Sequence, residues 1–572
     1  MFIIGLKKNY DNKFIGMCGI FFLKYLASQK IDDKQLEFIL NNFERIQHRG
    51  PDNTEYKVDG NTFIGFHRLA INGLTDRGDQ PFVYDKPNGH KVYVICNGEI
   101  YNYRELNNRY DLELEDGDSD CAVIYPLYEK LGLEKMINLL DGVFAFVIYD
   151  SETNLICAGR DPIGVRPLFF GISNDKVGFS SEAKALVDLL DVKPFPPGSY
   201  FQSDEGFPKA FFHIDEFKEN GPNPYLSLSS DKEIYDTVQK VFINACKKRL
   251  LSDRPIGSLL SGGLDSSLVA SIVQREMLKQ GKRLNTYSIG FKGSPDLKMA
   301  KIVADHIGSN HHEVYLDMKD ILDRLPEIIM QLETWDTTTI RASIGMFFLS
   351  EYIKNNSDDV VIFSGEGADE LCQGYLYFHR QPNDFEGYAE SMRLMKNLYM
   401  YDVLRADRTT AFHGLELRVP FLDKEFMKLI TSLPPRKICP RKHIEKYLIR
   451  RSFQGTGLLP DEILWRTKEA FSDGVSSEEN NWLDKLKKYA NTNITDDEFE
   501  KGKSSSIFGP KPRTKEEYYY RRIFNAFYYH NEDWIVDYWM PKWCPETNDP
   551  SARTLTLYSN LNSKESVSSN AV

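Results

Sequence analysis

A chain of 572 residues is too long for one ordinary hydrophobic core, so two or more domains are expected. Hydrophobic residues make up 41% and charged residues 27%, which is typical of a soluble globular protein. The net charge of -12 argues against a general nucleic-acid or membrane-surface binder. No apolar run approaches the roughly 18 residues of a membrane helix. Eight scattered cysteines without a Cys-x-x-Cys pair favour a reducing compartment, so we expect a large cytoplasmic α/β enzyme.

The chain begins with a predicted N-terminal extension or propeptide, residues 1–17, ahead of a candidate nucleophile. This stretch has no long apolar core and no small-residue cleavage site, so it is not typical of a secretion signal. Cys18 follows Met17 directly and precedes an apolar, strand-like run. Once Met17 is removed, the α-amine of Cys18, with a pKa of about 7.7–8.0, can accept the thiol proton near neutral pH. A small buried apolar side chain is the alternative interpretation of this cysteine.

A set of five residues, all C-terminal to Cys18, is suited to the hydrolysis of an amide. Asn97 and the Gly98 N–H can stabilise a developing oxyanion, because both can donate hydrogen bonds to it. Arg68 can bind a carboxylate through two parallel hydrogen bonds, and Glu99 and Asp120 can bind an ammonium group. Each residue alone would also suit a turn or a surface ion pair. Together with the cysteine, they predict a pocket for glutamine.

A change in composition separates this region from the rest of the chain. Residues 206–234 are rich in glycine, proline, asparagine and serine, which is typical of a linker. We therefore expect a first domain over residues 18–205 and a second over residues 235–540. A helix from Lys232 to Leu250 is predicted at the junction.

The segment Ser261-Gly262-Gly263-Leu264-Asp265-Ser266-Ser267 lies between a predicted strand, Ile256 to Leu260, and a helix predicted to begin at Ser267. A strand, a glycine turn and a helix N-terminus together favour anion binding. The segment lacks the Gly-Lys-Ser/Thr ending of a Walker A loop. Asp265 would repel a phosphate unless a divalent cation lay between them. The segment therefore predicts a pyrophosphate–Mg²⁺ loop, with an ordinary strand-to-helix turn as the alternative.

A second acidic loop follows another predicted strand, Val360 to Phe363. It reads Ser364-Gly365-Glu366-Gly367-Ala368-Asp369-Glu370. Asp265 and Asp369, on separate loops, can hold Mg²⁺ on a triphosphate that would otherwise repel a carboxylate nucleophile. Lys468 can neutralise charge on the phosphoryl group in the transition state. A solvated acidic turn is the alternative interpretation of this loop.

These motifs together resemble two known families. Residues 17–205 look like the N-terminal-nucleophile glutaminase domain of class II amidotransferases, and residues from about 235 to 540 look like the synthetase domain of glutamine-hydrolysing asparagine synthetases. The resemblance implies an αββα sandwich followed by a doubly wound parallel α/β domain of the ATP-pyrophosphatase type. It implies glutamine, aspartate and ATP as substrates, Mg²⁺ as the metal, and a β-aspartyl-AMP intermediate. Such relatives are often dimers, so a homodimer is one expectation. Residues 541–572 are expected to form a partly disordered tail.

The resemblance also implies roles for individual residues. In the first domain, Cys18 is the nucleophile, Asn97 and Gly98 form the oxyanion hole, and the glutamine contacts are Arg68, Asn97, Glu99 and Asp120. In the second domain, Asp265 and Asp369 bind the metal, and Glu366 and Lys468 are catalytic. The implied ATP contacts are Leu259, Ser261, Gly262, Gly263, Asp265, Ser266, Ser267, Ser288, Ile289, Gly290, Ser364, Gly365 and Lys468. The implied aspartate contacts are Thr339, Arg341, Tyr375, Asp402 and Arg405.

Two features depart from the family pattern. In the family the cysteine follows the initiator methionine, whereas here Met17 is preceded by further residues. Three explanations stand, in order of preference: translation from Met17, removal of residues 1–17, or a silent glutaminase that leaves an ammonia-dependent enzyme. Second, Gln373 stands where relatives usually carry glycine, which predicts a backbone without a positive φ at this position.

Two other functions fit the same residues. An enzyme of the same architecture could act on another carboxylate, although the implied aspartate contacts favour a small amino acid. A non-catalytic regulatory paralogue would require every candidate acid, amide and cysteine to be incidental. A β-lactam-forming relative is disfavoured because such enzymes lack the glutaminase cysteine.

Overall fold

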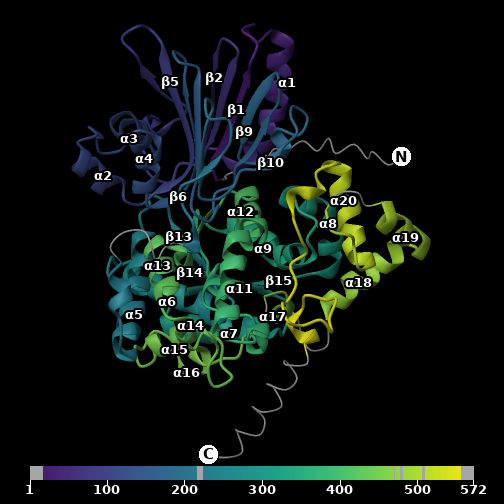
Figure 1. The fold of residues 1–572 in the computed structure, drawn as a ribbon. Helices are drawn as coiled ribbons and strands as arrows, with labels where there is room; N and C mark the ends of the chain where they lie inside the picture. The colour runs from purple at the N-terminus through teal and green to yellow at the C-terminus, as the bar shows by residue number, and fades with distance from the viewer. Residues whose placement is uncertain (1–16, 216–222, 469–470, 477–480, 506–508, 556–572) are drawn as a thin grey trace, which may run out of the picture.

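The computed structural model describes residues 17–215, 223–468, 471–476, 481–505 and 509–555. Its N-terminal half contains two antiparallel six-stranded sheets that face each other (Figure 1). The first sheet has the order β10-β8-β9-β1-β3-β2 and the second the order β12-β11-β7-β6-β5-β4. The strands of the first sheet are β1 (Gly19–Tyr25), β2 (Asn53–Asp59), β3 (Thr62–Arg68), β8 (Phe169–Ile172), β9 (Lys176–Ser180) and β10 (Lys193–Pro194). Those of the second are β4 (Phe82–Asp85), β5 (Lys91–Ile100), β6 (Gly142–Asp150), β7 (Leu155–Arg160), β11 (Ser199–Gln202) and β12 (Lys209–Ala210).

Alternating apolar side chains explain why the sheets pack on both faces. In β1, Ile20 and Phe22 point into the core between the sheets, where they join Ile95 of β5. Phe21 points the other way and packs against Phe43 of helix α1, with ring centroids 5.8 Å apart. Three helices cover the outer face of the second sheet, so the αββα sandwich is confirmed. These three are α2 (Tyr103–Tyr110), α3 (Ile124–Leu131) and α4 (Leu133–Leu139), whereas α1 (Asp33–Phe43) packs on the outer face of the first sheet.

The second half is built on a parallel five-stranded sheet in the order β15-β14-β13-β16-β17. The chain moves outward from β13 first in one direction and then in the other, so the predicted doubly wound domain is confirmed. In such a sheet, loops on either side of this reversal open a crevice at the carboxyl ends of the strands. The strands are β13 (Ile256–Leu259), β14 (Asn285–Gly290), β15 (Asn310–Tyr315), β16 (Val361–Phe363) and β17 (Glu416–Arg418).

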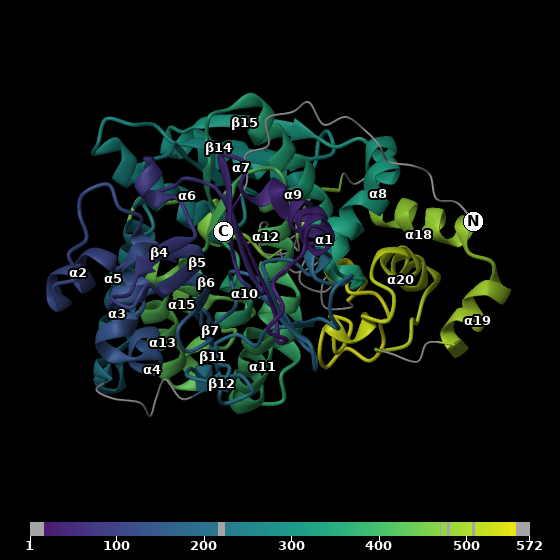
Figure 2. The same cartoon turned by 90° about the horizontal axis from the view of Figure 1, so that it is seen from above.

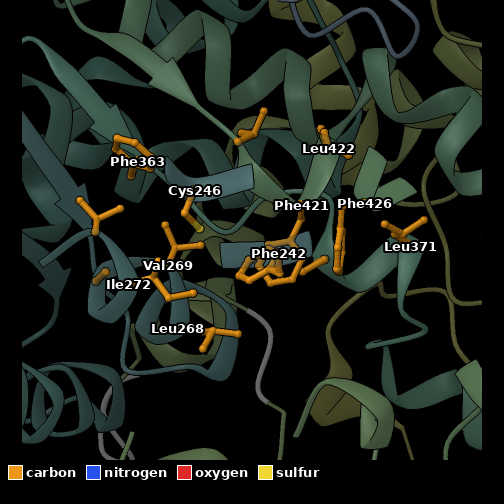
Figure 3. Packing of buried hydrophobic residues seen from close by; sticks show 14 of the residues in the cluster. Phe242, Cys246, Leu268, Val269, Ile272, Phe363, Leu371, Phe421, Leu422 and Phe426 are labelled. Carbon is orange, nitrogen blue, oxygen red and sulfur yellow. The ribbon is translucent and has the colours of Figure 1, made fainter. Parts of the chain in front are cut away.

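Helices pack on both faces of this sheet. Figure 3 shows Phe242 of α5 close to Phe421 and Phe426, and Val269 and Ile272 of α6 belong to the same cluster as Phe363 of β16. The helices that the argument needs are α5 (Asp231–Lys248), α6 (Leu264–Leu278), α7 (Pro295–Ile307), α8 (Met318–Leu332), α9 (Thr337–Asn356), α10 (Ala368–Leu371) and α12 (Asp402–Phe412).

The last part of the described chain folds against the synthetase-like half. Helices α18 (Trp482–Asn493), α19 (Asp496–Ser505) and α20 (Lys515–Phe527) lie together at one flank in both views (Figure 1, Figure 2). Asp549 lies in the region predicted as a tail, yet it pairs with Arg341 at 3.0 Å. Residues 541–555 therefore pack on the domain, and the rest of the predicted tail lies outside the described residues.

Two local expectations differ from the structure, and one alternative interpretation is excluded. Helix α6 begins at Leu264 rather than at Ser267, so Asp265 lies in its first turn. The pair Asn97-Gly98, often a turn, lies inside strand β5. The prediction for Gln373 was wrong, because its φ is 53°. Here the chain turns back after α10, and the Gly374 N–H donates to the Asp369 carbonyl at 2.8 Å, which holds this left-handed conformation. Within the described ranges, no helix is both long and apolar enough to cross a membrane.

Candidate functional site

A small cavity in the N-terminal half is lined by all six residues predicted for glutamine hydrolysis. They come from the start of β1, the end of β3, the end of β5 and the turn before α3. The six residues are Cys18, Arg68, Asn97, Gly98, Glu99 and Asp120. The tertiary structure therefore places the candidate nucleophile and its candidate partners around one space.

Cys18 lies at the edge of this cavity with its thiol held by the backbone of Leu69. The Leu69 N–H donates to Sγ at 3.4 Å, and the thiol can donate to the Leu69 carbonyl at 3.4 Å. Burial raises the pKa of the thiol to about 12. In the 572-residue chain the nitrogen of Cys18 is a peptide nitrogen, because Met17 precedes it. The thiol therefore needs a base before it can act as a nucleophile near neutral pH.

The candidate oxyanion hole has one free donor and one strict steric requirement. Asn97 Nδ2 is buried and has no hydrogen-bond partner among the residues that the structure describes. A Cβ atom on Gly98 would lie 2.2 Å from the Val143 carbonyl oxygen, so only glycine fits this register of β5 against β6. An unpaired buried amide N–H is costly unless a ligand accepts its hydrogen bond. This geometry suits an oxyanion.

The charged residues of the cavity are already partly engaged. Arg68 donates to Asp79 at 2.6 Å and to the Thr75 carbonyl at 2.8 Å. Burial raises the pKa of Asp120 to about 6, while the Ile100 N–H that donates to it at 2.6 Å opposes this shift. Burial also raises the pKa of Glu99 well above its ordinary value, and the neighbouring Asp120 adds to this effect.

Residues from the other half complete the cavity, and sequence reasoning missed them. Glu416 of β17 lines the cavity, and Arg418 of the same strand lies with Nη2 3.2 Å from Glu99 Oε2. No local motif marked them, because they come from a strand more than 300 residues away in the chain, at the domain contact. Asn72, which donates to Glu99 at 2.5 Å, was missed for the same lack of a motif.

A larger cavity of about 200 Å³ lies at the carboxyl ends of β13, β14 and β16. The loops that follow these strands bring most of the predicted nucleotide residues together. The predicted ATP, metal and catalytic residues that line it are Leu259, Ser261, Gly263, Asp265, Ser266, Ser288, Ile289, Ser364, Gly365, Glu366, Asp369 and Lys468. The predicted aspartate residues Thr339, Arg341, Tyr375, Asp402 and Arg405 line it too.

Three predicted ATP residues lie beside this cavity but not on its wall. Gly262 has a φ of 72°, and a Cβ atom there would lie 2.4 Å from the Ala300 nitrogen, so its contribution is to the turn. Ser267 is fully buried in α6, and a Cβ atom on Gly290 would lie 2.4 Å from Ser294 Oγ. These residues shape the loops instead of lining the space between them.

The two candidate metal ligands face each other across two lysines. Lys468 Nζ lies 2.6 Å from Asp369 and 3.9 Å from Asp265, and Lys446 Nζ contacts both carboxylates, at 2.5 Å from Asp369. Burial opposes ionisation of Asp369, but the two ammonium groups outweigh it and hold its pKa well below the ordinary range. Lys446 was not predicted, since no strand or glycine loop marks its segment.

The donor set around Asp265 fits a divalent cation shared with phosphates. Asp265 Oδ1 is buried and has no hydrogen-bond partner in the described part of the chain. No group of three or more His, Cys, Asp and Glu side chains able to hold a metal occurs among the described residues. Two carboxylates would therefore supply part of the coordination shell, and phosphate oxygens the rest, as is usual for Mg²⁺ with nucleotides.

A second group of charges, centred on Glu366 and Arg405, also lines this cavity. Glu366 pairs with Arg405 at 2.7 Å, and Arg405 also pairs with Asp402. Burial raises the pKa of Glu366 to about 7, although Arg405 opposes the shift. A carboxyl group with a pKa near neutrality is suited to accept and release protons. Tyr375 donates to Glu370, a buried carboxyl whose pKa is raised well above its ordinary value by burial and by Asp402.

Thr339 and Arg341 line the cavity with their polar groups already used. The Thr339 hydroxyl donates to Asp336, the N-cap of α9, at 2.7 Å. Arg341 donates to Glu516 at 2.6 and 2.9 Å and to Asp549 at 3.0 and 3.1 Å. Their assignment to aspartate stays a prediction, and their present contacts are structural.

Two family models match the chain. The glutamine amidotransferase domain model matches residues 17–200, and the asparagine synthase model matches residues 237–393 and 386–556. Similar proteins include glutamine-hydrolysing asparagine synthetases from Mus musculus, 45% identical over 552 residues, and from Homo sapiens, 44% identical over 552 residues. Another, from Gallus gallus, is 45% identical over 544 residues. Each match covers 90% of this chain and 95% of the relative.

Proposed function

The chain belongs to the asparagine synthase family, and on that premise we propose that it makes L-asparagine from L-aspartate, using ATP and ammonia from glutamine. The observation that carries the proposal is the presence of two cavities in one chain. One surrounds a cysteine with an unpaired amide donor, and the other brings two aspartates and two lysines together. The first suits amide hydrolysis, and the second suits chemistry on a polyphosphate.

In the glutaminase half, the Cys18 thiolate attacks the side-chain amide of glutamine. Once the preceding residues are absent, the α-amine of Cys18 accepts the thiol proton. It thereby supplies the base that the buried thiol needs because its pKa is raised. Asn97 Nδ2 and the Gly98 N–H donate to the oxyanion. Ammonia leaves, and water then hydrolyses the thioester to glutamate. Arg68, Glu99 and Asp120 hold the carboxylate and α-ammonium group of the substrate.

In the synthetase half, the β-carboxylate of aspartate attacks the α-phosphorus of ATP and pyrophosphate leaves. Lys446 and Lys468 neutralise charge on the phosphates. Asp265 and Asp369 would hold Mg²⁺, which would screen the phosphate charge from the attacking carboxylate. Ammonia then attacks the activated carboxyl carbon, AMP leaves, and Glu366 accepts the proton that the attacking nitrogen loses.

The acceptor is bound at the end of the cavity where Tyr375, Asp402 and Arg405 lie. Arg405 suits the α-carboxylate of aspartate, and Asp402 its ammonium group. Another carboxylate as acceptor is the second candidate, because Glu370 adds a buried carboxyl that the aspartate assignment does not use. A screen of carboxylates with ATP and ammonia, scored by AMP formation, separates the two candidates.

The proposal is tested by comparing glutamine and ammonia as nitrogen donors. In Cys18→Ala we expect asparagine formation from glutamine to be lost and formation from ammonia to be kept. Loss of both activities would contradict the division of chemistry between the two cavities.

N-terminal sequencing of the active protein tests the base, because an intact Met1 with full glutamine-driven activity would contradict the role of the Cys18 amine. Cell fractionation and light scattering test two further parts of the proposal, a cytoplasmic location and a homodimeric assembly.

A further inference from the structure

Strand β17 contacts residues of both cavities. It pairs in parallel with β16, with Phe363 opposite Arg418. The Ser364 N–H donates to the Arg418 carbonyl at 2.9 Å. Ser364 begins the segment that contains Glu366 and Asp369 and lines the synthetase cavity. The backbone of Arg418 is therefore hydrogen-bonded to the wall of that cavity.

The side chain of Arg418 points the other way, into the glutaminase half. It is fully buried, and its Nη2 lies 3.2 Å from Glu99 Oε2. The rest of the guanidinium is held in place: Nε donates to Glu416 at 2.6 Å, and Nη1 donates to the carbonyls of Arg249 and Leu251 at 2.7 Å each. These bonds fix the guanidinium with Nη2 at ion-pair distance from the Glu99 carboxylate, although the two groups form no hydrogen bond.

Glu99 needs a cation nearby to stay ionised, because it is buried among acidic side chains. Glu99 is 3% exposed and has Asp120 and Glu416 as acidic neighbours. Burial and both acids disfavour its ionised form, whereas Arg418 favours it. Within the glutaminase half Asn72 donates to Glu99, but an amide carries no charge to offset a buried carboxylate. Arg418 of the synthetase half is the cation paired with Glu99, and Arg166 of the glutaminase half favours the ionised form less strongly.

We propose that Arg418 is a positioning residue of the glutamine site, which holds the Glu99 carboxylate ready for the α-ammonium group of glutamine. The glutamine site is thus completed by a strand of the synthetase domain. This inference rests on the proposed function, in which Glu99 contacts glutamine.

The test measures the KM for glutamine by glutamate release, with ammonia-driven AMP formation as a separate readout. Arg418→Lys keeps the charge but loses the fixed fork of the guanidinium. We expect the KM for glutamine to rise about tenfold or more, as for the loss of one partner of a buried ion pair, with a much smaller change in the ammonia-driven rate. The matched control is Arg249→Lys, which changes a buried arginine that also lies over the Tyr101 ring and pairs with Asp423 but has no contact with Glu99. The substitution keeps the Arg249 carbonyl that accepts from Arg418, so the KM for glutamine should stay within about twofold of the wild type.

A double-mutant cycle separates positioning from a structural effect. If Arg418 acts through Glu99, adding Arg418→Lys to Glu99→Gln should raise the KM for glutamine little beyond Glu99→Gln alone. Additive effects, or equal losses of the glutamine- and ammonia-driven reactions in Arg418→Lys, would overturn the inference. An unchanged KM in Glu99→Gln would overturn the proposed glutamine contact as well. A raised KM in Glu99→Gln with a normal Arg418→Lys enzyme would overturn the Arg418 inference alone.

Discussion

Replacing Arg341 by methionine should destabilise the synthetase half strongly. Arg341 is 3% exposed and Glu516 is 4% exposed, and the two share hydrogen bonds of 2.6 and 2.9 Å. The change leaves Glu516 with the Tyr520 hydroxyl at 2.8 Å as its remaining partner, and it leaves Asp549 with Lys487 at 2.9 Å and the Ser551 N–H at 2.8 Å. Removing one partner of a buried ion pair typically costs about 3–5 kcal/mol, because a buried charge is left uncompensated. We expect a loss of this size in the free energy of unfolding.

Urea unfolding followed by tryptophan fluorescence measures this loss, since Trp482 and Trp539 are buried in this half. Adding Glu516→Gln to Arg341→Met should recover part of the stability, because the unpaired charge is then removed. Lys319→Met is the surface control: its pair with Asp323 is exposed to solvent, so the substitution should leave the free energy of unfolding nearly unchanged. A loss below about 1 kcal/mol in Arg341→Met, with a raised KM for aspartate, would refute the structural interpretation and favour a substrate contact.

Three further predictions follow from single side chains. Asp369→Asn should reduce ammonia-driven AMP formation by about 100-fold or more, because it removes a candidate metal ligand and leaves Lys446 and Lys468 facing a neutral amide; near wild-type AMP formation would contradict the site. Burial lowers the pKa of His67 to about 4, so the folded protein resists protonation there, and stability should fall by roughly 3 kcal/mol as the pH drops from about 6.5 towards 4. His67→Gln should weaken this pH dependence, and an equal slope in both proteins would refute it. Phe242→Ala should cost about 3–5 kcal/mol in unfolding free energy, since its ring lies 4.3 Å from that of Phe421 in the core (Figure 3); equal stability of the variant and the wild type would contradict this packing.

The sequence predicted the candidate sites well where a loop follows a strand. The segments beginning at Ser261, Ser288 and Ser364 each come after or at the end of an apolar run, and parallel strands end at the same edge of a sheet. The strand pattern and the glycines thus predicted the loops at Ser261 and Ser364, and the resemblance added the segment at Ser288. The same holds for Asn97 and Gly98, whose strand brings them to the cysteine, although their place inside β5 was not expected.

Other features had no local signal. The left-handed Gln373 is set by the turn around it, against the intrinsic preference of a glutamine residue. Arg341 fitted a substrate contact by resemblance, but Glu516 and Asp549, which lie far along the chain, already pair with it. Lys446 lies between the two aspartates only because the chain returns to the cavity near its end.

The sequence by itself determined the fold class and the loops that follow the strands, because these depend on periodicity and glycine turns within short segments, whereas many of the residues that line the two cavities were assigned by resemblance. Only the tertiary structure decided which charges share a buried space. Glu99 is paired by Arg418 from the other domain, and Asp265 and Asp369 are bridged by Lys446. Such pairing depends on distances between segments that are far apart in the sequence. In the low-dielectric interior these distances decide whether a buried charge is compensated.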